Sequence, residues 1–179
     1  MLTPDTQPII ALGVLSSAIT YETGRTVANK CRQRRNNIRL ASRRFPDVLD
    51  KTVVMRFLLS ANYSHRASAR TQAANAALMV EAHKEAHMEK DVVFLPMTES
   101  FHLCAWKKLL WYKHALVAWP TAQYFGIADD DAYVQLAHLA ADLRTLKPSS
   151  PYVLYGLILW KSYYNKVTLE PATAHSGWG

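Results

Sequence analysis

Three consecutive carboxylates at residues 129–131 are the side chains of this chain best suited to chemistry. Neighbouring carboxylates about 4 Å apart repel each other by about 1 kcal/mol per pair in water and by about 4 kcal/mol at an effective dielectric of 20. A bound cation would relieve that repulsion. Asp oxygens are hard ligands that suit Mg²⁺ or Mn²⁺, and such ions usually take one or two carboxylates together with substrate phosphates.

The place of these carboxylates in the chain also favours a ligand site. An apolar run at residues 123–128 predicts a buried strand, so the carboxylates follow its carboxyl end, where open α/β sheets bind ligands. Because side chains alternate along an extended segment, we expect Asp129 and Asp131 to face one way and Asp130 the other. The alternative is an acidic turn that caps a helix beginning near Tyr133, since Asp is a favoured N-cap residue. The pattern alone leaves both interpretations open.

The segments around this turn alternate between apolar strand patterns and helical patterns. This order predicts an α/β fold with a mostly parallel sheet and helices on both faces. Gly13, inside the first apolar run, indicates close approach of a backbone or a ligand. Predicted strands are 9–15, 52–60, 91–96 and 123–128, with 152–160 as a further extended segment, and predicted helices are 23–44, 67–90, 103–119 and 133–146. For the helix at 103–119 the expected buried residues are Trp106, Leu109, Leu110, Ala115 and Leu116.

Composition and charge narrow the class of protein. The chain has 179 residues, of which 50% are hydrophobic and 20% charged, as expected for one soluble globular domain. A formal net charge of +7 suits an anionic partner such as a nucleotide, a nucleic acid or a membrane surface. No apolar run is long enough for a transmembrane helix, and residues 1–8 lack the pattern of a signal peptide. We therefore expect any membrane anchor to lie outside this chain.

Six arginines between residues 32 and 44 raise the possibility of nucleic-acid binding. No aromatic residues interleave with them, so the segment lacks a platform on which bases could stack. We expect a solvated helix face or a rim for an anionic substrate, and no nucleic-acid partner.

Two further groups of residues could bind metal or react. His83 and His87 are one helical turn apart, but no Glu directly follows His83 as the metalloprotease pattern requires, and we expect exposed histidines near a helix end. Cys31 and Cys104 form neither a disulfide framework nor a zinc-site spacing. Both are expected to be small buried side chains.

Four stretches of the chain resemble the β-1,3-galactosyltransferase-like family (glycosyltransferase family 31), whose members are hexosyltransferases that use UDP-sugars on a GT-A fold. The resemblance covers about residues 9 to 160, and the motif at 128–134 is similar to the family's metal motif, Lys-Thr-Asp-Asp-Asp-x-Phe-Val. The stretches are 10–17 with Arg25, 53–60, 85–101 with Lys107, and 128–134.

This resemblance implies a reaction and a set of site residues. A hexose, galactose or N-acetylglucosamine, would pass from UDP to a hydroxyl of a glycan or glycoprotein acceptor, with Mn²⁺ (or Mg²⁺) as cofactor. Asp131 and Asp129 would bind the metal, with Asp131 in direct contact. The implied donor-binding residues are Ser16, Ser17, Arg25, Lys107, Asp129 and Asp130.

Several positions depart from the family's pattern. Asn29 replaces an arginine, and residues 103–105 and 127–128 replace Asn-Leu-Thr and Lys-Thr. No general base is identified, and the acceptor-binding half of the family is not found. We therefore expect residues 1–179 to be a single, incomplete nucleotide-sugar-binding domain, and the family implies the lumenal side of the Golgi membrane.

Three other functions remain open at this point. A noncatalytic UDP-binding domain would bind nucleotide without turnover. A nucleic-acid-binding module would show affinity that falls steeply with salt and would not need the three carboxylates. An acidic cation site without sugar chemistry would bind metal regardless of UDP.

Overall fold

The computed structural model describes residues 7–19, 27–64, 68–100 and 103–146, together with Val153, Tyr155 and Gly156. The chain divides into two compact units, Met1–Leu146 and Lys147–Gly179. All the helices and strands described below belong to the first unit. The prediction of one domain over the whole chain stays a prediction, and most of the segment expected to be extended at 152–160 lies outside the described residues.

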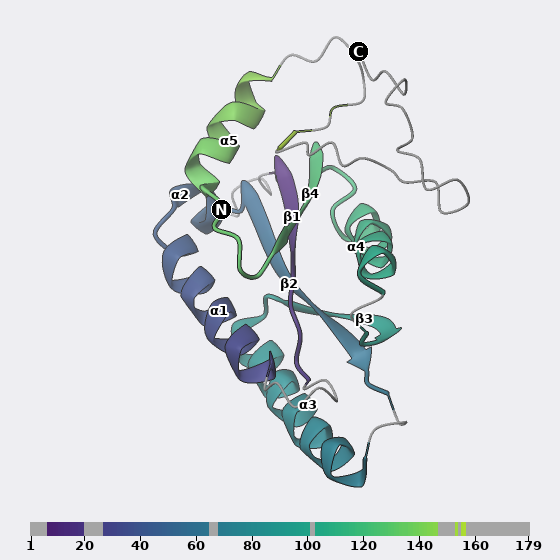
Figure 1. Cartoon of the computed structure of the whole chain (residues 1–179). Coiled ribbons are helices and arrows are strands. Elements are labelled where there is room, and N and C mark those ends of the chain that lie inside the picture. The colour runs from purple at the N-terminus through teal and green to yellow at the C-terminus, as the bar shows by residue number, and fades with distance from the viewer. Residues whose placement is uncertain are drawn as a thin grey trace, which may run out of the picture. The chain divides into compact units, whose positions relative to one another are not determined.

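Within the described residues, four parallel strands form a sheet in the order β3-β2-β1-β4 (Figure 1). β1 lies in the centre, where Leu15 is opposite Leu58 of β2 on one side and Asp129 of β4 on the other. The carboxyl ends of the strands therefore share one edge, and the predicted parallel sheet is confirmed. The strands are β1 (Ile10–Leu15), β2 (Val53–Asn62), β3 (Val92–Thr98) and β4 (Tyr124–Asp129).

Helices cover both faces of this sheet, as the alternating pattern predicted. α4 packs on one face, and α1, α2, α3 and α5 lie on the other (Figure 1). None of the described helices is long and apolar enough to cross a membrane. The helices are α1 (Val27–Ser42), α2 (Pro46–Leu49), α3 (Ala69–Glu89), α4 (Cys104–Ala118) and α5 (Leu136–Thr145).

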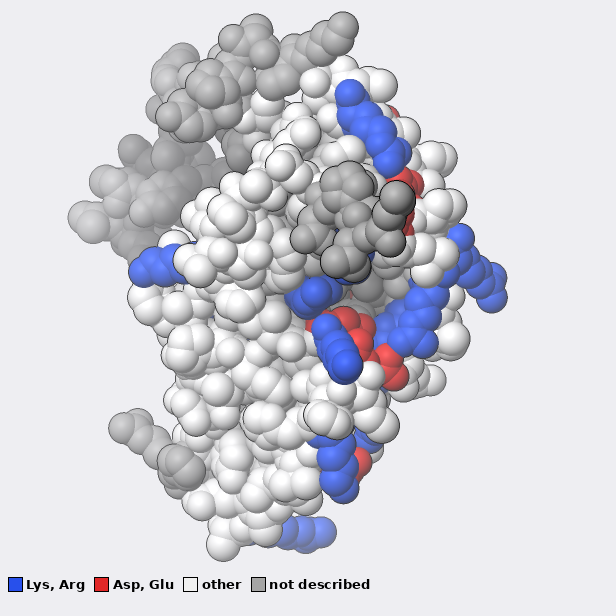
Figure 2. Space-filling model, turned by 180° about the vertical axis from the view of Figure 1, so that it is seen from behind, with Lys and Arg blue, Asp and Glu red and all other residues white. Residues whose placement is uncertain are grey.

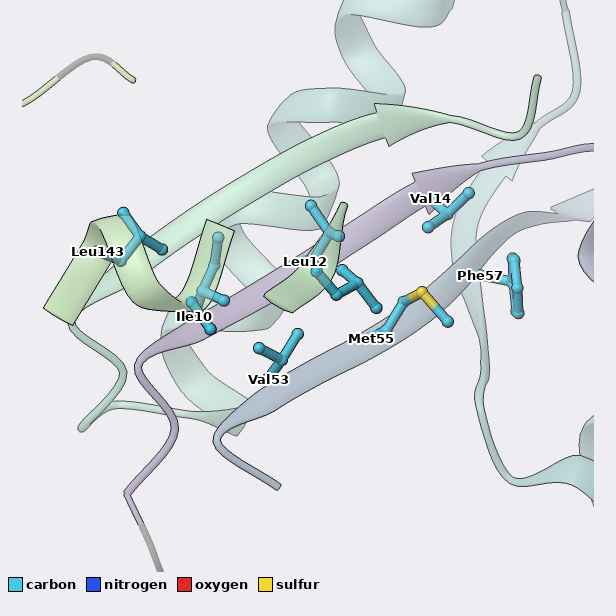
Figure 3. Close-up of a cluster of buried hydrophobic side chains, with 9 residues drawn as sticks. Ile10, Leu12, Val14, Val53, Met55, Phe57 and Leu143 are labelled. Atoms are coloured by element: carbon cyan, nitrogen blue, oxygen red, sulfur yellow. The ribbon is translucent and has the colours of Figure 1, made fainter. Parts of the chain in front are cut away.

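The central strand is buried on both faces because parallel sheets are covered on both sides. Ile10, Leu12 and Val14 point toward the face that α5 covers, where they meet Met55 of β2 (Figure 3). Ala11 and Leu15 belong to the core on the α4 face. Burying each large apolar side chain contributes about 1.5–3 kcal/mol, so this alternation fixes the register of β1.

Gly13 lets α4 lie directly against the sheet. A Cβ atom at this position would lie 2.6 Å from Cε2 of Trp111, a separation that real contacts do not allow. The indole of Trp111 also donates a hydrogen bond to the carbonyl oxygen of Gly126, at 2.9 Å. The prediction of a close approach at Gly13 is confirmed, and the approaching group is the Trp111 ring.

The buried side of α4 differs from the predicted one. Trp106, Leu109 and Leu116 are exposed, so their assignment to the core was wrong, whereas Ala115 is buried and Leu110 is partly buried as expected. The buried stripe instead contains Lys107, Trp111 and Ala115, which are four residues apart. Apolar residues surround most of α4, so periodicity could not select its buried face.

Other predicted boundaries and burials also need correction. α1 ends at Ser42 and α5 begins at Leu136, three residues after the predicted start. Cys31 is buried as expected, but Cys104, the first residue of α4, is exposed, so its predicted burial was wrong.

Candidate functional site

The chain changes direction across the sheet between β1 and β4, because β2 and β3 follow on one side of β1 and β4 lies on the other. Ligands of open α/β sheets bind outside the carboxyl ends of the strands at such a switch point. Here the Ser16 hydroxyl donates a hydrogen bond to Oδ2 of Asp130, at 2.6 Å. The amide of Asp130 also donates to the carbonyl oxygen of Leu15, at 3.1 Å. The loop after β1 and the turn after β4 are thus joined.

The three carboxylates differ in exposure along the turn. Asp129 ends β4 and is exposed, Asp130 is buried, and the side chain of Asp131 is 61% exposed. This follows the expected alternation. The helix-cap interpretation was wrong, because α5 begins at Leu136 and its N-cap residue is Gln135, which makes no side-chain capping bond.

Arg34 of α1 joins the two later carboxylates of the turn. Its Nη1 donates to Oδ1 of Asp130 at 3.0 Å, and its Nη2 lies 3.4 Å from Oδ2 of Asp131. Burial is the largest single influence on the pKa of Arg34 and lowers it, but the hydrogen bond to Asp130 and the charges of Asp130 and Asp131 together outweigh burial and raise the pKa. In the sequence, Arg34 was one of six arginines between residues 32 and 44, and nothing distinguished it from the others. Its pairing with Asp130 and Asp131 was therefore not predicted.

Arg35, the next residue of α1, binds the loop after β1 that contains Ser16 and Ser17. It reaches this loop from the face of the sheet on which α1 lies. Arg35 is 2% exposed, and its Nη1 donates to Oγ of Ser16 at 2.9 Å and to the carbonyl oxygen of Ser17 at 3.0 Å. Its Nε and Nη2 donate to both carboxylate oxygens of Glu85, at 2.8 and 2.7 Å. Ser16 and Ser17, which the family resemblance implies lie by the nucleotide, both accept hydrogen bonds from Arg35.

A second buried arginine extends this network along α1. Arg39 pairs with Glu85 at 2.7 Å and with both oxygens of Asp91, at 2.7 and 2.8 Å. Burial acts to raise the pKa of Glu85, but the bonds and charges of Arg35 and Arg39 hold it below its usual value. The segment was expected to be a solvated helix face or a rim for an anionic substrate, and the solvated face was wrong for Arg35 and Arg39, which are buried. The only feature of the sequence that pointed to a shared partner was that Arg35 and Arg39 are four residues apart and so lie on the same face of a helix.

Lys107 reaches the same loop from the opposite face of the sheet. Its Nζ donates to the carbonyl oxygen of Ser16 at 2.7 Å and to Oε2 of Glu99 at 2.8 Å, and both charged side chains are buried. Ser16 is therefore held by a cation from each side of the sheet, Arg35 of α1 and Lys107 of α4. Among the other predicted site residues, Arg25 lies outside the described residues.

A cavity of about 450 Å³ adjoins the turn on the face where α1 and α5 lie. Arg34 and Asp129, Asp130 and Asp131 form its polar end. The rest is lined mainly by apolar side chains, among them Leu12, Val14, Ile38 and Met55. Ligand pockets usually measure about 300–1,000 Å³ and combine apolar walls with a few polar groups, so this cavity has the size and lining of a ligand site.

Charged side chains gather unevenly over the surface. Figure 2 shows the molecule from behind the view of Figure 1, with acidic and basic side chains side by side on one half and few charges on the other. On α1 and α3, charges are paired across the two helices, as in the contact of Arg32 with Glu81 at 3.8 Å. Much of the arginine charge is thus already neutralised by the protein.

The fit of a metal ion depends on the exposed carboxylates of the turn. Within residues 7–19, 27–64, 68–100 and 103–146, no three or more His, Cys, Asp or Glu side chains are grouped so that they could hold a metal. Asp129 and Asp131 supply hard oxygens from two carboxylates, the number that Mg²⁺ or Mn²⁺ takes when phosphates complete the coordination. The residues therefore fit a metal that binds together with a phosphate ligand. His83 and His87 are exposed as expected, and the His83 ring stacks on Phe94 with centroids 4.2 Å apart.

Comparison with known families identifies the origin of this arrangement. The family model described as Galactosyltransferase matches residues 33–171. The chain belongs to the galactosyltransferase family. The matched region contains Arg34, Arg35 and Arg39 of α1, Lys107 and the three carboxylates, whereas Ser16 and Ser17 precede it. The α/β architecture with its parallel sheet is a GT-A-like fold, as predicted. Among curated proteins, none matches the chain closely enough to be counted as a relative.

Proposed function

We propose that this galactosyltransferase-family protein binds a UDP-sugar and transfers its hexose to a hydroxyl of a glycan or glycoprotein. The observation that carries this proposal is the turn at residues 129–131, which lies at the switch point between β1 and β4 beside a cavity of about 450 Å³. The proposal places the reaction on the lumenal side of the Golgi membrane, as the family resemblance implies.

The residues of the turn have different proposed roles in donor binding. Asp131 and Asp129, which are exposed, would hold Mn²⁺ or Mg²⁺. When bound, the metal supplies Lewis-acid neutralisation of the donor diphosphate. Asp130 is bonded to Ser16 and Arg34, so it orients the loop and the arginine. Ser16 and Ser17, held by Arg35 and Lys107, would lie by the nucleotide.

Transfer also needs a base that takes the proton of the acceptor hydroxyl. We assign no described residue to this role.

Calorimetric titration of UDP into the folded protein tests the proposal. We expect binding in Mn²⁺, no binding in EDTA, and a loss of at least about tenfold for Asp131→Asn, since a metal ligand or its partners typically contribute that much to affinity. Asp142→Asn removes an exposed carboxylate of α5 and is the matched control, expected to bind UDP as the wild type does. A folded wild type that ignores UDP under all these conditions overturns the proposal.

A noncatalytic UDP-binding domain is the second candidate, favoured by the absence of an assigned base among the described residues. It predicts the same titration but no hexose transfer to any acceptor. Nucleic-acid binding is less favoured, because Arg35 and Arg39 are buried in ion pairs and cannot meet phosphates of a nucleic acid.

A further inference from the structure

The positively charged guanidinium of Arg34 lies between the carboxylates of Asp130 and Asp131 in the proposed donor site. It is bonded to Asp130 at 3.0 Å and lies 3.4 Å from Asp131, so one guanidinium spans both side chains. It also lines the cavity that adjoins the turn. A guanidinium has five N–H donors, so these two contacts leave several of them available.

The two contacts of Arg34 differ in strength. The Asp130 side chain is 7% exposed and lies 3.0 Å from Nη1 of Arg34, whereas the Asp131 side chain is 61% exposed and lies 3.4 Å from Nη2. Exposed ion pairs contribute little, and buried charge-assisted bonds contribute more. A competing cation would therefore displace Arg34 from Asp131 before it displaces Arg34 from Asp130.

We propose that Arg34 is a positioning residue that holds Asp131 in the free protein and turns to the donor diphosphate when a metal takes Asp131. This inference rests on the proposed function. The bond from Nη1 to Asp130 keeps the guanidinium in place during the exchange, and Arg34 lines the cavity beside the turn. Guanidinium groups bind phosphate oxygens in pairs, which makes arginine suited to both partners.

The exchange has a consequence for the order of binding. Metal alone must displace Arg34 from Asp131 without any new partner for the guanidinium. Metal with UDP provides that partner, so each ligand strengthens the binding of the other, and the coupling is reciprocal. We expect weak binding of Mn²⁺ alone and stronger binding of Mn²⁺ in the presence of UDP.

Replacement of Arg34 tests separately its effect on the affinity for Mn²⁺ alone and its effect on the affinity for UDP. In Arg34→Gln, Mn²⁺ without nucleotide is expected to bind about two- to fivefold more tightly, the change that corresponds to loss of one exposed ion pair. UDP in saturating Mn²⁺ is expected to bind at least about tenfold more weakly, as loss of a charge-assisted phosphate contact implies. Calorimetry and electron paramagnetic resonance of free Mn²⁺ measure both affinities.

Arg32→Gln is the matched control. Arg32 lies on the same helix, is 46% exposed against 42% for Arg34, and pairs with Glu81 instead of the turn. It reports the effect of lowering the net charge by one, and we expect both affinities to stay within about twofold of the wild type, since exposed pairs contribute little. If Arg34→Gln behaves like Arg32→Gln in both titrations, the inference is wrong.

Two further measurements cover the cases in which Arg34→Gln is unfolded or the wild type does not bind UDP. Arg34→Lys keeps the charge but cannot span both carboxylates, so it should lie between the wild type and Arg34→Gln, and it replaces the latter if circular dichroism shows that the glutamine variant is unfolded. A wild type that binds Mn²⁺ but never UDP overturns the proposed function and the diphosphate role of Arg34. In that case the metal titration alone still decides whether Arg34 holds Asp131.

Discussion

The hydroxyl of Ser16 donates a hydrogen bond of 2.6 Å to Asp130, a residue 114 positions later in the chain. This contact joins the loop after β1 to the turn after β4 at the switch point of the sheet. It also explains why three adjacent carboxylates can have different roles. Asp130 is buried and bonded to Ser16 and Arg34, whereas Asp129 and Asp131 are exposed, and Asp131 contacts only Arg34 among the ion pairs of the described residues.

Replacement of Asp130 and Asp131 should separate stability from ligand binding. Asp130→Asn weakens bonds to Ser16 and Arg34 and should lower the free energy of unfolding by about 1–3 kcal/mol, the cost of an impaired buried hydrogen bond. Asp131→Asn changes an exposed side chain, and we expect a stability change within about 0.5 kcal/mol. Urea unfolding followed by circular dichroism measures both. Equal losses of stability would contradict the division of roles.

Stability should fall in acid because of Glu85. Its pKa is lowered in the folded protein, with burial opposing and Arg35 and Arg39 causing the shift. The unfolded chain therefore takes up this proton first, at its ordinary value of about 4.3. The contribution is complete above that pH and is lost as the pH falls through the lower folded pKa. Unfolding free energies measured between pH 3 and 7 should decline below about pH 4.3.

Two variants test whether Glu85 causes the loss of stability in acid. Glu85→Gln leaves two buried guanidinium groups without their shared carboxylate, so we expect a loss of about 3–5 kcal/mol at pH 7 and a flatter dependence on pH. Glu81→Gln on the same helix removes an exposed carboxylate and should leave the acid transition close to that of the wild type. A Glu85→Gln protein as stable as the wild type would refute the structural role of the network.

Gly13 should not tolerate a side chain. Gly13→Ala places a Cβ atom 2.6 Å from Trp111 and 2.8 Å from Leu58, and such overpacking costs about 1–3 kcal/mol. At Gly126 the nearest atoms are the Cδ1 atoms of Leu12 and Ile10, at 3.0 and 3.1 Å, which are the ends of flexible side chains. We expect Gly126→Ala to cost less, and thermal unfolding of both variants decides the order.

The two cysteines should react at different rates. Burial raises the pKa of the Cys31 thiol, and the charge of nearby Asp130 adds to this effect. Cys104 is exposed. Because the thiolate is the reactive form, an aromatic disulfide reagent at pH 8 should label Cys104 at least about tenfold faster than Cys31. Cys104→Ser should remove the fast phase, and a persistent fast phase in that variant would show that Cys31 is open to solvent.

Much of the fold follows from local patterns. Continuous apolar runs located all four strands, because strands of a covered parallel sheet are buried on both faces. Helix boundaries were less accurate, as for α5, because Asp129 to Asp131 looked like a cap while the chain turns for several more residues before Leu136. The buried face of α4 was missed because its apolar residues encircle the helix.

The sequence by itself determined the alternation of strands and helices, the acidic turn after β4 and the resemblance to the galactosyltransferase family. These features depend on residue type and short spacing, which a single chain displays directly. Only the tertiary structure decided that Arg34 pairs with the turn, that Arg35 and Arg39 are buried with Glu85, and that Lys107 reaches Ser16. Those pairs join residues on different elements, and charge alone cannot select among many possible partners until the sheet brings particular ones within a few ångströms.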